Sequence, residues 1–213
     1  MKQYLVCIDR DGTINRDPGH FGKDLNWREQ LELYPSVIEG IKLLNTQHEI
    51  KTAVISNQAG VARKYFGIGR VEEINRTIDD ILRKNSAIIH TWQYCPFITP
   101  DYIKKKNISE NLLDKNWIKE TDLRKPGIGM LRKSAEALNM SLSDFSRIYI
   151  IGDQLSDLET AINITGIGIL IPDQNNNLQS AQTLIKKHPT RIIIKNNFYE
   201  ACYYILEDIK NSL

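Results

Sequence analysis

The stretch VCIDRDGTIN, residues 6–15, joins an apolar run to two carboxylates and a glycine. The run YLVCI at 4–8 has the nearly continuous apolar character of a strand that is buried on both faces. Asp9 and Asp11 follow that run at once, and Gly12 lets the chain turn there. A buried strand that ends in two carboxylates predicts a chemical site at the carboxyl end of a sheet.

Further apolar runs alternate with helical patterns along the rest of the chain. We expect strands at 51–56, 88–94, 147–152, 166–171 and 191–195, and helices at 36–47, 69–84, 129–140, 156–165 and 197–213. This alternation predicts a doubly wound, mostly parallel α/β sheet of the Rossmann type, with helices on both faces. We expect residues 1–213 to form a single domain without a large cap domain. One long loop with weak periodicity, at about 95–128, is expected over the site.

Composition excludes several classes of protein. The 213 residues can form a substantial core, and 41% hydrophobic and 25% charged residues are ordinary for a soluble protein. A net charge of +2 gives no reason to expect a nucleic acid partner. The cysteines, at 7, 95 and 202, are scattered and odd in number, which favours a reducing compartment. With no signal-peptide pattern and no long apolar run, we expect a cytoplasmic protein without a membrane partner. We also expect the protein to be a monomer.

Polar clusters follow four of the expected strands. They are Asp9 and Asp11 after the first strand, Ser56, Asn57 and Gln58 after the second, Arg124 and Lys125 at the end of the long loop, and Asp153 with Asp157 after the strand at 147–152. Any one cluster is common in turns, helix caps or solvated surfaces. Because the carboxyl ends of parallel strands meet at one edge, the four clusters in this order predict one joint site.

This series resembles the haloacid dehalogenase (HAD) superfamily of phosphatases, whose nucleophile motif reads DRDGT here and whose other motifs match at Ser56, Lys125 and Asp153. The resemblance implies that Asp9 attacks phosphorus and forms an aspartyl-phosphate. Asp11 would give a proton to the leaving alkoxide and later take one from water. Lys125 and the Ser56 hydroxyl would neutralise charge on the transferred phosphoryl group.

The same resemblance implies a magnesium ion. Two carboxylates close together repel each other, and a cation between them relieves that repulsion. Asp9 and Asp153, with the main-chain carbonyl of Asp11, would form an oxygen-rich site of the kind that Mg²⁺ prefers. Asp157 is expected to hold a metal-bound water or to orient a ligand.

Further motifs narrow the resemblance. DRDGTIN, SNQAGVARKYF, CP and RKPGIGM are similar to the histidinol-phosphatase-like branch, and within it most similar to the phosphatases that remove the C7 phosphate of D-glycero-D-manno-heptose 1,7-bisphosphate in nucleotide-activated heptose (surface polysaccharide) biosynthesis. The match covers roughly residues 3–171. It implies a phosphorylated sugar as substrate, with contacts from Asp17, Pro18, Gly19, His20, Asn57, Gln58, Ala59, Arg124 and Gln154. Arg124 would bind the phosphate that stays, whereas His20 is equally well explained as an exposed loop residue.

The chain departs from that branch at a structural zinc site, commonly a Cys-x-His pair and a later Cys-x-Cys. Cys95 is present, but the other ligand positions read Phe97, Thr121 and Leu123. Zinc needs four nitrogen or sulfur ligands, so we expect no zinc here. Apolar contacts are expected to hold the loop instead, from Tyr94, Phe97, Ile98 or Trp117.

Three alternatives remain open. A histidinol-phosphate phosphatase shares the catalytic motifs, although its cationic substrate calls for an acidic contact where Arg124 stands. A non-catalytic binding domain of the same fold has no need of five intact motif residues. A nucleic acid 3′-phosphatase also carries a DxDGT motif, but beyond the lysines at 104–106 the sequence has no basic stretch with interleaved aromatic residues.

Overall fold

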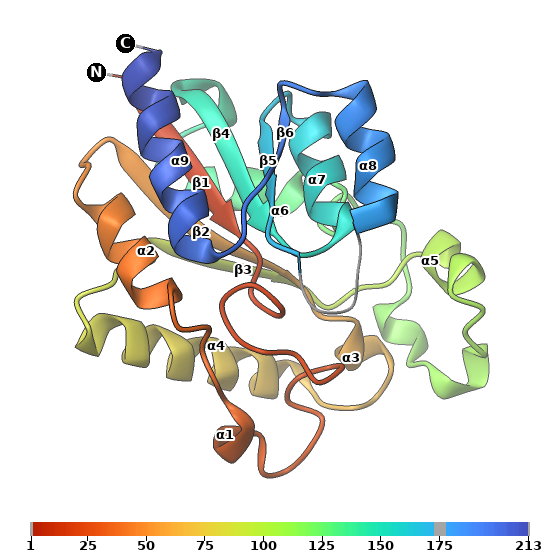
Figure 1. Cartoon of the computed structure of the whole chain (residues 1–213). Coiled ribbons are helices and arrows are strands. Elements are labelled where there is room, and N and C mark those ends of the chain that lie inside the picture. The colour runs from red at the N-terminus through yellow and green to blue at the C-terminus, as the bar shows by residue number, and fades with distance from the viewer. Residues whose placement is uncertain (1, 173–177, 213) are drawn as a thin grey trace.

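The computed structural model describes residues 2–172 and 178–212. Six parallel strands form one sheet in the order β3-β2-β1-β4-β5-β6 (Figure 1). The strands are β1 (Gln3–Ile8), β2 (Ile50–Asn57), β3 (Thr91–Cys95), β4 (Phe145–Gly152), β5 (Ile167–Leu170) and β6 (Ile192–Ile194). This architecture confirms the predicted fold class.

Helices connect consecutive strands, and a last helix follows β6. They are α1 (Trp27–Gln30), α2 (Val37–Asn45), α3 (Ala59–Ala62), α4 (Ile68–Lys84), α5 (Pro100–Lys105), α6 (Gly129–Ala137), α7 (Leu155–Asn163), α8 (Leu178–Lys187) and α9 (Phe198–Asn211), with 3₁₀ turns η1 (Glu110–Leu112), η2 (Lys115–Trp117) and η3 (Leu142–Asp144). Each predicted strand and helix is present, with ends that differ by a few residues. The predictions did not include α8 or the short helices α1, α3 and α5.

The strand expected at 88–94 begins later than predicted, at Thr91. Just before it, the His90 ring approaches β2, with Nδ1 3.1 Å from the main-chain nitrogen of Thr52. Ile88 is 43% exposed and its main-chain groups bond to the Asn45 side chain at the end of α2. The Asn45 side chain therefore takes the place of a strand partner at Ile88, whereas the main-chain nitrogen of His90 still donates to the Thr52 carbonyl of β2 (3.0 Å).

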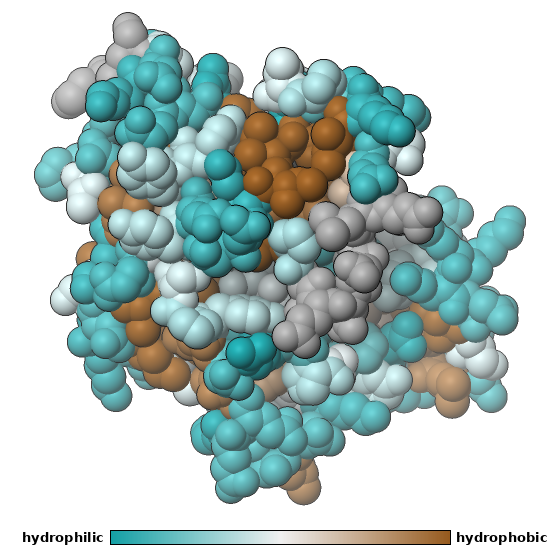
Figure 2. All heavy atoms as spheres, in the orientation of Figure 1, coloured by the Kyte–Doolittle hydropathy of each residue, from teal (hydrophilic) through white to brown (hydrophobic). Residues whose placement is uncertain are grey.

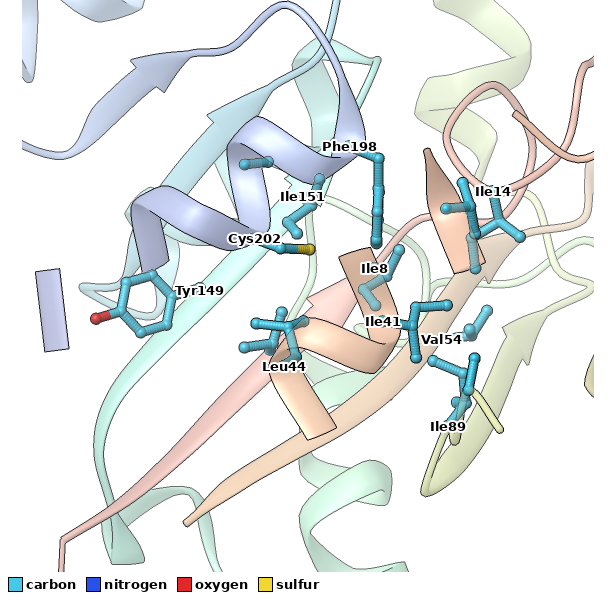
Figure 3. Packing of buried hydrophobic residues seen from close by; sticks show 14 of the residues in the cluster. Ile8, Ile14, Ile41, Leu44, Val54, Ile89, Tyr149, Ile151, Phe198 and Cys202 are labelled. Atoms are coloured by element: carbon cyan, nitrogen blue, oxygen red, sulfur yellow. The ribbon is translucent and has the colours of Figure 1, made fainter. Parts of the chain in front are cut away.

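Alternate residues of the strands pack against helices on opposite faces of the sheet. Val6 and Ile8 of β1 face α2, α4 and α9, where Ile41 and Phe198 are among the buried partners (Figure 3). Leu5 and Cys7 face the other side, which α6 and α7 cover. The N and C termini lie side by side at the end of the molecule opposite α3 and α5 (Figure 1), and Lys2 Nζ donates to the Ser212 carbonyl (3.0 Å).

The segment 95–128 is more ordered than its sequence predicted. It contains α5, η1 and η2, and Ile98, Ile103 and Leu113 are buried in a cluster of their own against α3. Trp117 joins this cluster, and its ring centroid lies 5.3 Å from that of Phe97. Tyr94 was expected to make apolar contacts in this segment, but its hydroxyl donates a hydrogen bond to Glu72 of α4 (3.0 Å). The weak periodicity has a simple cause, since α5 is only six residues long.

The outer surface is largely hydrophilic on the face shown in Figure 2. Apolar side chains gather there over the edge strand β6, where Ile194 is 40% exposed. Within residues 2–172 and 178–212, no helix is long and apolar enough to cross a membrane. All three cysteines are buried free thiols.

Candidate active site

The site lies where the strand order changes direction, between β1 and β4. The main-chain nitrogen of Asp9 donates to the carbonyl of Ile151 (2.9 Å), so the residues that follow β1 and β4 are neighbours. Gly12 has φ of +86°, and a Cβ there would lie 2.5 Å from Oδ2 of Asp153. The turn after β1 therefore needs glycine both for its backbone conformation and for the close approach of Asp153.

Lys125 joins the carboxylates of this edge. Its Nζ lies 2.8 Å from Oδ1 of Asp9 and 2.6 Å from Oδ1 of Asp157, and it donates to the Ile55 carbonyl at 3.0 Å. Three acceptors thus match the three protons of the ammonium group. Asn57 fixes the backbone of Lys125, since its side chain bonds both to the main-chain nitrogen (3.0 Å) and to the carbonyl (3.1 Å). Burial would lower the pKa of Lys125, but the two carboxylates raise it, so the group stays charged.

Asp9, Asp153 and Asp157 form a buried acidic cluster, with one oxygen of each within 4.8 Å of the others. Both carboxylate oxygens of Asp157 have protein partners, because Oδ1 pairs with Lys125 and Oδ2 accepts from the main-chain nitrogen of Gln154 (3.0 Å). It therefore orients Lys125. Burial and then the charge of Asp157 raise the pKa of Asp153 to about 7. Burial likewise raises the pKa of Asp9 well above its usual value, and Lys125 opposes that rise.

These observations fit the predicted magnesium ion. Carboxylates that repel each other in a buried site gain most from a divalent cation, and oxygen is the ligand that Mg²⁺ prefers. Asp9 and Asp153 would hold it, with the Asp11 main-chain carbonyl as predicted. The Asp11 side chain is not part of the acidic cluster.

The Asp11 carboxylate accepts four hydrogen bonds. Arg10 donates from Nε to Oδ1 (3.0 Å) and from NH2 to Oδ2 (2.7 Å). Asn15 donates to Oδ1 (3.1 Å) and Gln58 donates to Oδ2 (2.7 Å). Burial would raise the pKa of Asp11, but the Arg10 charge and these hydrogen bonds lower it. Gln58 also donates to Oγ of Ser56 (2.7 Å), which leaves the hydroxyl proton available for a ligand.

A cavity of about 910 Å³ opens above these groups. The predicted site residues that line it are Asp9, Asp11, Asp17, Gly19, His20, Ser56, Asn57, Gln58, Ala59, Arg124, Lys125 and Gln154. Pro18 does not line it and is exposed. Asp153 and Asp157 do not line it either, because they are buried beneath it at 3% and 0% exposure.

The loop after β1 forms one wall of the cavity. Oδ1 of Asp17 accepts from the main-chain nitrogens of Gly19 (2.9 Å) and Phe21 (3.0 Å), so this side chain shapes the loop. His20 has φ of +57°, and its ring meets that of Tyr65 edge-on at 5.1 Å. Burial and the nearby charges, Arg63 first among them, lower the pKa of His20. A neutral ring at the cavity is the result.

The wall formed by 95–128 carries residues that the sequence reasoning missed as site residues. Asp101, Tyr102, Lys105 and Lys106 of this segment line the cavity, as does Glu159 of α7. The guanidinium carbon of Arg124 lies 4.0 Å from the centre of the Tyr102 ring, and NH1 donates to the Phe97 carbonyl (3.3 Å). The lysine run at 104–106 was the available signal, but its short helix gave no periodicity that could place it.

No family model matches the sequence. The chain is 31% identical to the D-glycero-β-D-manno-heptose-1,7-bisphosphate 7-phosphatase of Pseudomonas aeruginosa over 161 residues. These aligned residues make up 76% of this chain and 76% of the relative. The chain is 32% identical to the protein of the same name from Rhodopseudomonas palustris over 160 residues, 75% of this chain and 78% of the relative. The chain belongs to the family of these phosphatases. This assignment confirms the resemblance predicted from the motifs.

A solved structure supports the fold of this family member over most of its length. The D,D-heptose 1,7-bisphosphate phosphatase of B. bronchiseptica, complexed with magnesium and phosphate, matches with a TM-score of 0.71. The match covers 98% of this chain and 99% of that one, at 23% sequence identity. At that identity, the comparison establishes the shared sheet and helices.

Proposed function

We propose that this chain is a Mg²⁺-dependent phosphatase that removes the C7 phosphate of D-glycero-D-manno-heptose 1,7-bisphosphate. The observation that carries the proposal is the buried Lys125, which pairs with Asp9 at the floor of a cavity bordered by Arg124. The proposed substrate is that of the relatives in the family to which the chain belongs.

The geometry supports a two-step reaction. Asp9 attacks phosphorus and forms an aspartyl-phosphate, while Asp11 gives a proton to the oxygen of the leaving sugar. Lys125 and the Ser56 hydroxyl neutralise the charge that moves onto the phosphoryl oxygens. In the second step a water attacks the aspartyl-phosphate, and Asp11 takes its proton. A bound Mg²⁺ would stabilise the charge that develops on the transferred phosphoryl group.

The cavity offers cationic groups for a second phosphate. Arg124 lies on the Tyr102 ring, and Lys105 and Lys106 stand on the same wall. A guanidinium held by an aromatic face and a carbonyl is preorganised, so it loses less freedom when it binds a phosphate. The non-reacting C1 phosphate would lie there.

Histidinol phosphate remains the competing substrate. Asp101 and Glu159 line the cavity, and either could attract its cationic amine. The test is phosphate release over a panel containing both anomers of heptose 1,7-bisphosphate, histidinol phosphate and a 3′-phosphorylated oligonucleotide. We expect the heptose bisphosphates to give the highest kcat/KM. A preference for histidinol phosphate would assign the second function, and no turnover of any phosphate ester would favour a binding domain.

A further inference from the structure

The mechanism assigns no role to Arg10, which is 0% exposed although it stands between two catalytic carboxylates in the sequence. A guanidinium cannot be deprotonated in a protein, so its burial requires partners for its charge and its donors. Those partners are Asp11, through two hydrogen bonds, and Asn75 of α4, whose Oδ1 accepts from NH1 at 2.8 Å. Asn75 is itself buried.

Arg10 therefore connects Asp11 to the core rather than to solvent. The paired contacts fix both oxygens of the carboxylate, and the contact with Asn75 fixes the guanidinium in turn. Of the donors to Asp11, Gln58 lines the cavity, whereas Arg10 does not. The carboxylate is thus held from behind by Arg10 and touched from the cavity side by Gln58.

The number of donors has a consequence for proton transfer. A carboxylate has about four lone-pair sites, and Asp11 uses them on four protein donors. It can carry a proton only if one donor withdraws. Gln58 is the donor at the cavity, where a phosphoryl oxygen would compete for its amide.

We propose that Arg10, anchored by Asn75, is the positioning residue that holds Asp11 toward the leaving group, while Gln58 gives up its place to the transferred proton. This inference rests on the proposed phosphatase chemistry. In the step it serves, a bond forms between a carboxylate oxygen of Asp9 and phosphorus while the bond between phosphorus and the sugar oxygen breaks. The proton on Asp11 Oδ2 moves to that oxygen, and Asp11 ends as a carboxylate.

The test compares leaving groups. An alkyl phosphate needs a proton on its leaving oxygen, whereas p-nitrophenyl phosphate releases a stable anion without one. Arg10→Lys keeps the charge but cannot hold both oxygens and Asn75 together. We expect kcat/KM to fall by about 10²-fold or more for the alkyl substrate and by less than about 10-fold for p-nitrophenyl phosphate. The main-chain contact from Arg10 to Asp9 (2.8 Å) survives the substitution, so the nucleophile stays in place.

Two further variants distinguish a loss of positioning from a general loss of folding. Asn75→Leu removes the anchor of the guanidinium but keeps Arg10, and should give a smaller loss with the same leaving-group selectivity. Arg147→Lys is the matched control, because Arg147 also pairs with an aspartate, but its partner, Asp208, does not line the cavity as Asp11 does. This control variant should leave kcat/KM unchanged for both substrates. Equal losses on both substrates in Arg10→Lys and Asn75→Leu would overturn the proposal and assign Arg10 a purely structural role.

The outcome is separable from that of the proposed function. If the wild-type enzyme hydrolyses other alkyl phosphates but not the heptose bisphosphate, the substrate assignment fails and the comparison proceeds with those alkyl phosphates. If it hydrolyses no phosphate ester, the proposed chemistry fails, and the inference about Arg10 fails with it.

Discussion

The ammonium group of Lys125 lies 2.8 Å from Oδ1 of Asp9, and both side chains are nearly inaccessible to solvent, at 2% and 8% exposure. Lys125 lies near the end of the segment 95–128, between β3 and α6, whereas Asp9 directly follows β1. Desolvation raises the pKa of Asp9 in this buried site, and the charge of Lys125 opposes that rise and so favours the ionised nucleophile. It is the contact that makes this edge of the sheet a candidate for phosphoryl transfer.

Replacement of the nucleophile should abolish turnover. Asp9→Asn keeps the shape of the side chain but removes its negative charge, so we expect kcat to fall by about 10⁴-fold or more. Phosphate release measures the loss, and circular dichroism checks the fold. Asp80→Asn, at an exposed position of α4, is the control. A well-folded Asp9→Asn enzyme with near-normal activity would rule out an aspartyl-phosphate.

Activity should depend on Mg²⁺. EDTA should remove it and added Mg²⁺ should restore it, because Asp9 and Asp153 are placed to share a cation. Ca²⁺ should substitute poorly, since its larger and looser coordination shell misplaces the nucleophile relative to phosphorus. Full activity in chelator would contradict the assignment of these two residues as ligands.

The pH dependence of stability should reveal the raised pKa of Asp153. Burial and the Asp157 charge raise its pKa to about 7, so the folded chain binds this proton more tightly than the unfolded chain does. The resulting stabilisation is present at low pH and is lost as the pH rises through about 7. In EDTA we therefore expect the contribution of Asp153 to the free energy of unfolding to fall by a few kcal/mol as the pH rises, on the order of 1.4 kcal/mol per unit of pKa shift.

Thermal unfolding at about pH 5 and about pH 8, compared with Asp153→Asn, isolates this contribution from that of other groups. The wild-type chain should lose stability relative to the variant at the higher pH, and saturating Mg²⁺ should reverse that loss. Parallel curves for the two proteins would mean that Asp153 is ionised in the folded state at both values.

Arg124 should discriminate between substrates. Arg124→Ala should reduce kcat/KM for a sugar bisphosphate by about 10- to 150-fold, the equivalent of roughly 1.5–3 kcal/mol for a charged hydrogen bond. A monophosphate analogue should lose much less. Tyr102→Leu removes the ring beneath the guanidinium and should weaken bisphosphate binding in the same direction. If both substrates suffer equally in Arg124→Ala, the second phosphate is bound elsewhere.

The purified protein should carry far less than one zinc per chain. Cys95 is buried, and its thiol lies 3.6 Å from the Phe97 carbonyl. Ile98 and Trp117 supply the apolar contacts that hold this segment. Elemental analysis gives the zinc content, and thermal stability after chelation and return of Mg²⁺ should be unchanged. Stoichiometric, tightly held zinc would show that other ligands complete a site.

The sequence by itself determined the class of fold and the edge where the site lies. Apolar runs alternating with helical patterns require parallel strands, and the carboxyl ends of such strands meet at one edge. Asp9, Ser56, Lys125 and Asp153 could therefore be brought together from their order alone. Family motifs added the role of each residue.

Only the tertiary structure decided where the neighbouring side chains point. Arg10 is adjacent to Asp9 in sequence, yet its burial depends on Asn75 of α4, and no local pattern reports that contact. Asp157 turns to Lys125, and Tyr102 lies beneath Arg124, because helices from distant parts of the chain pack there. Side-chain direction at a site depends on long-range packing, whereas strand order and strand ends follow from the local pattern of the chain.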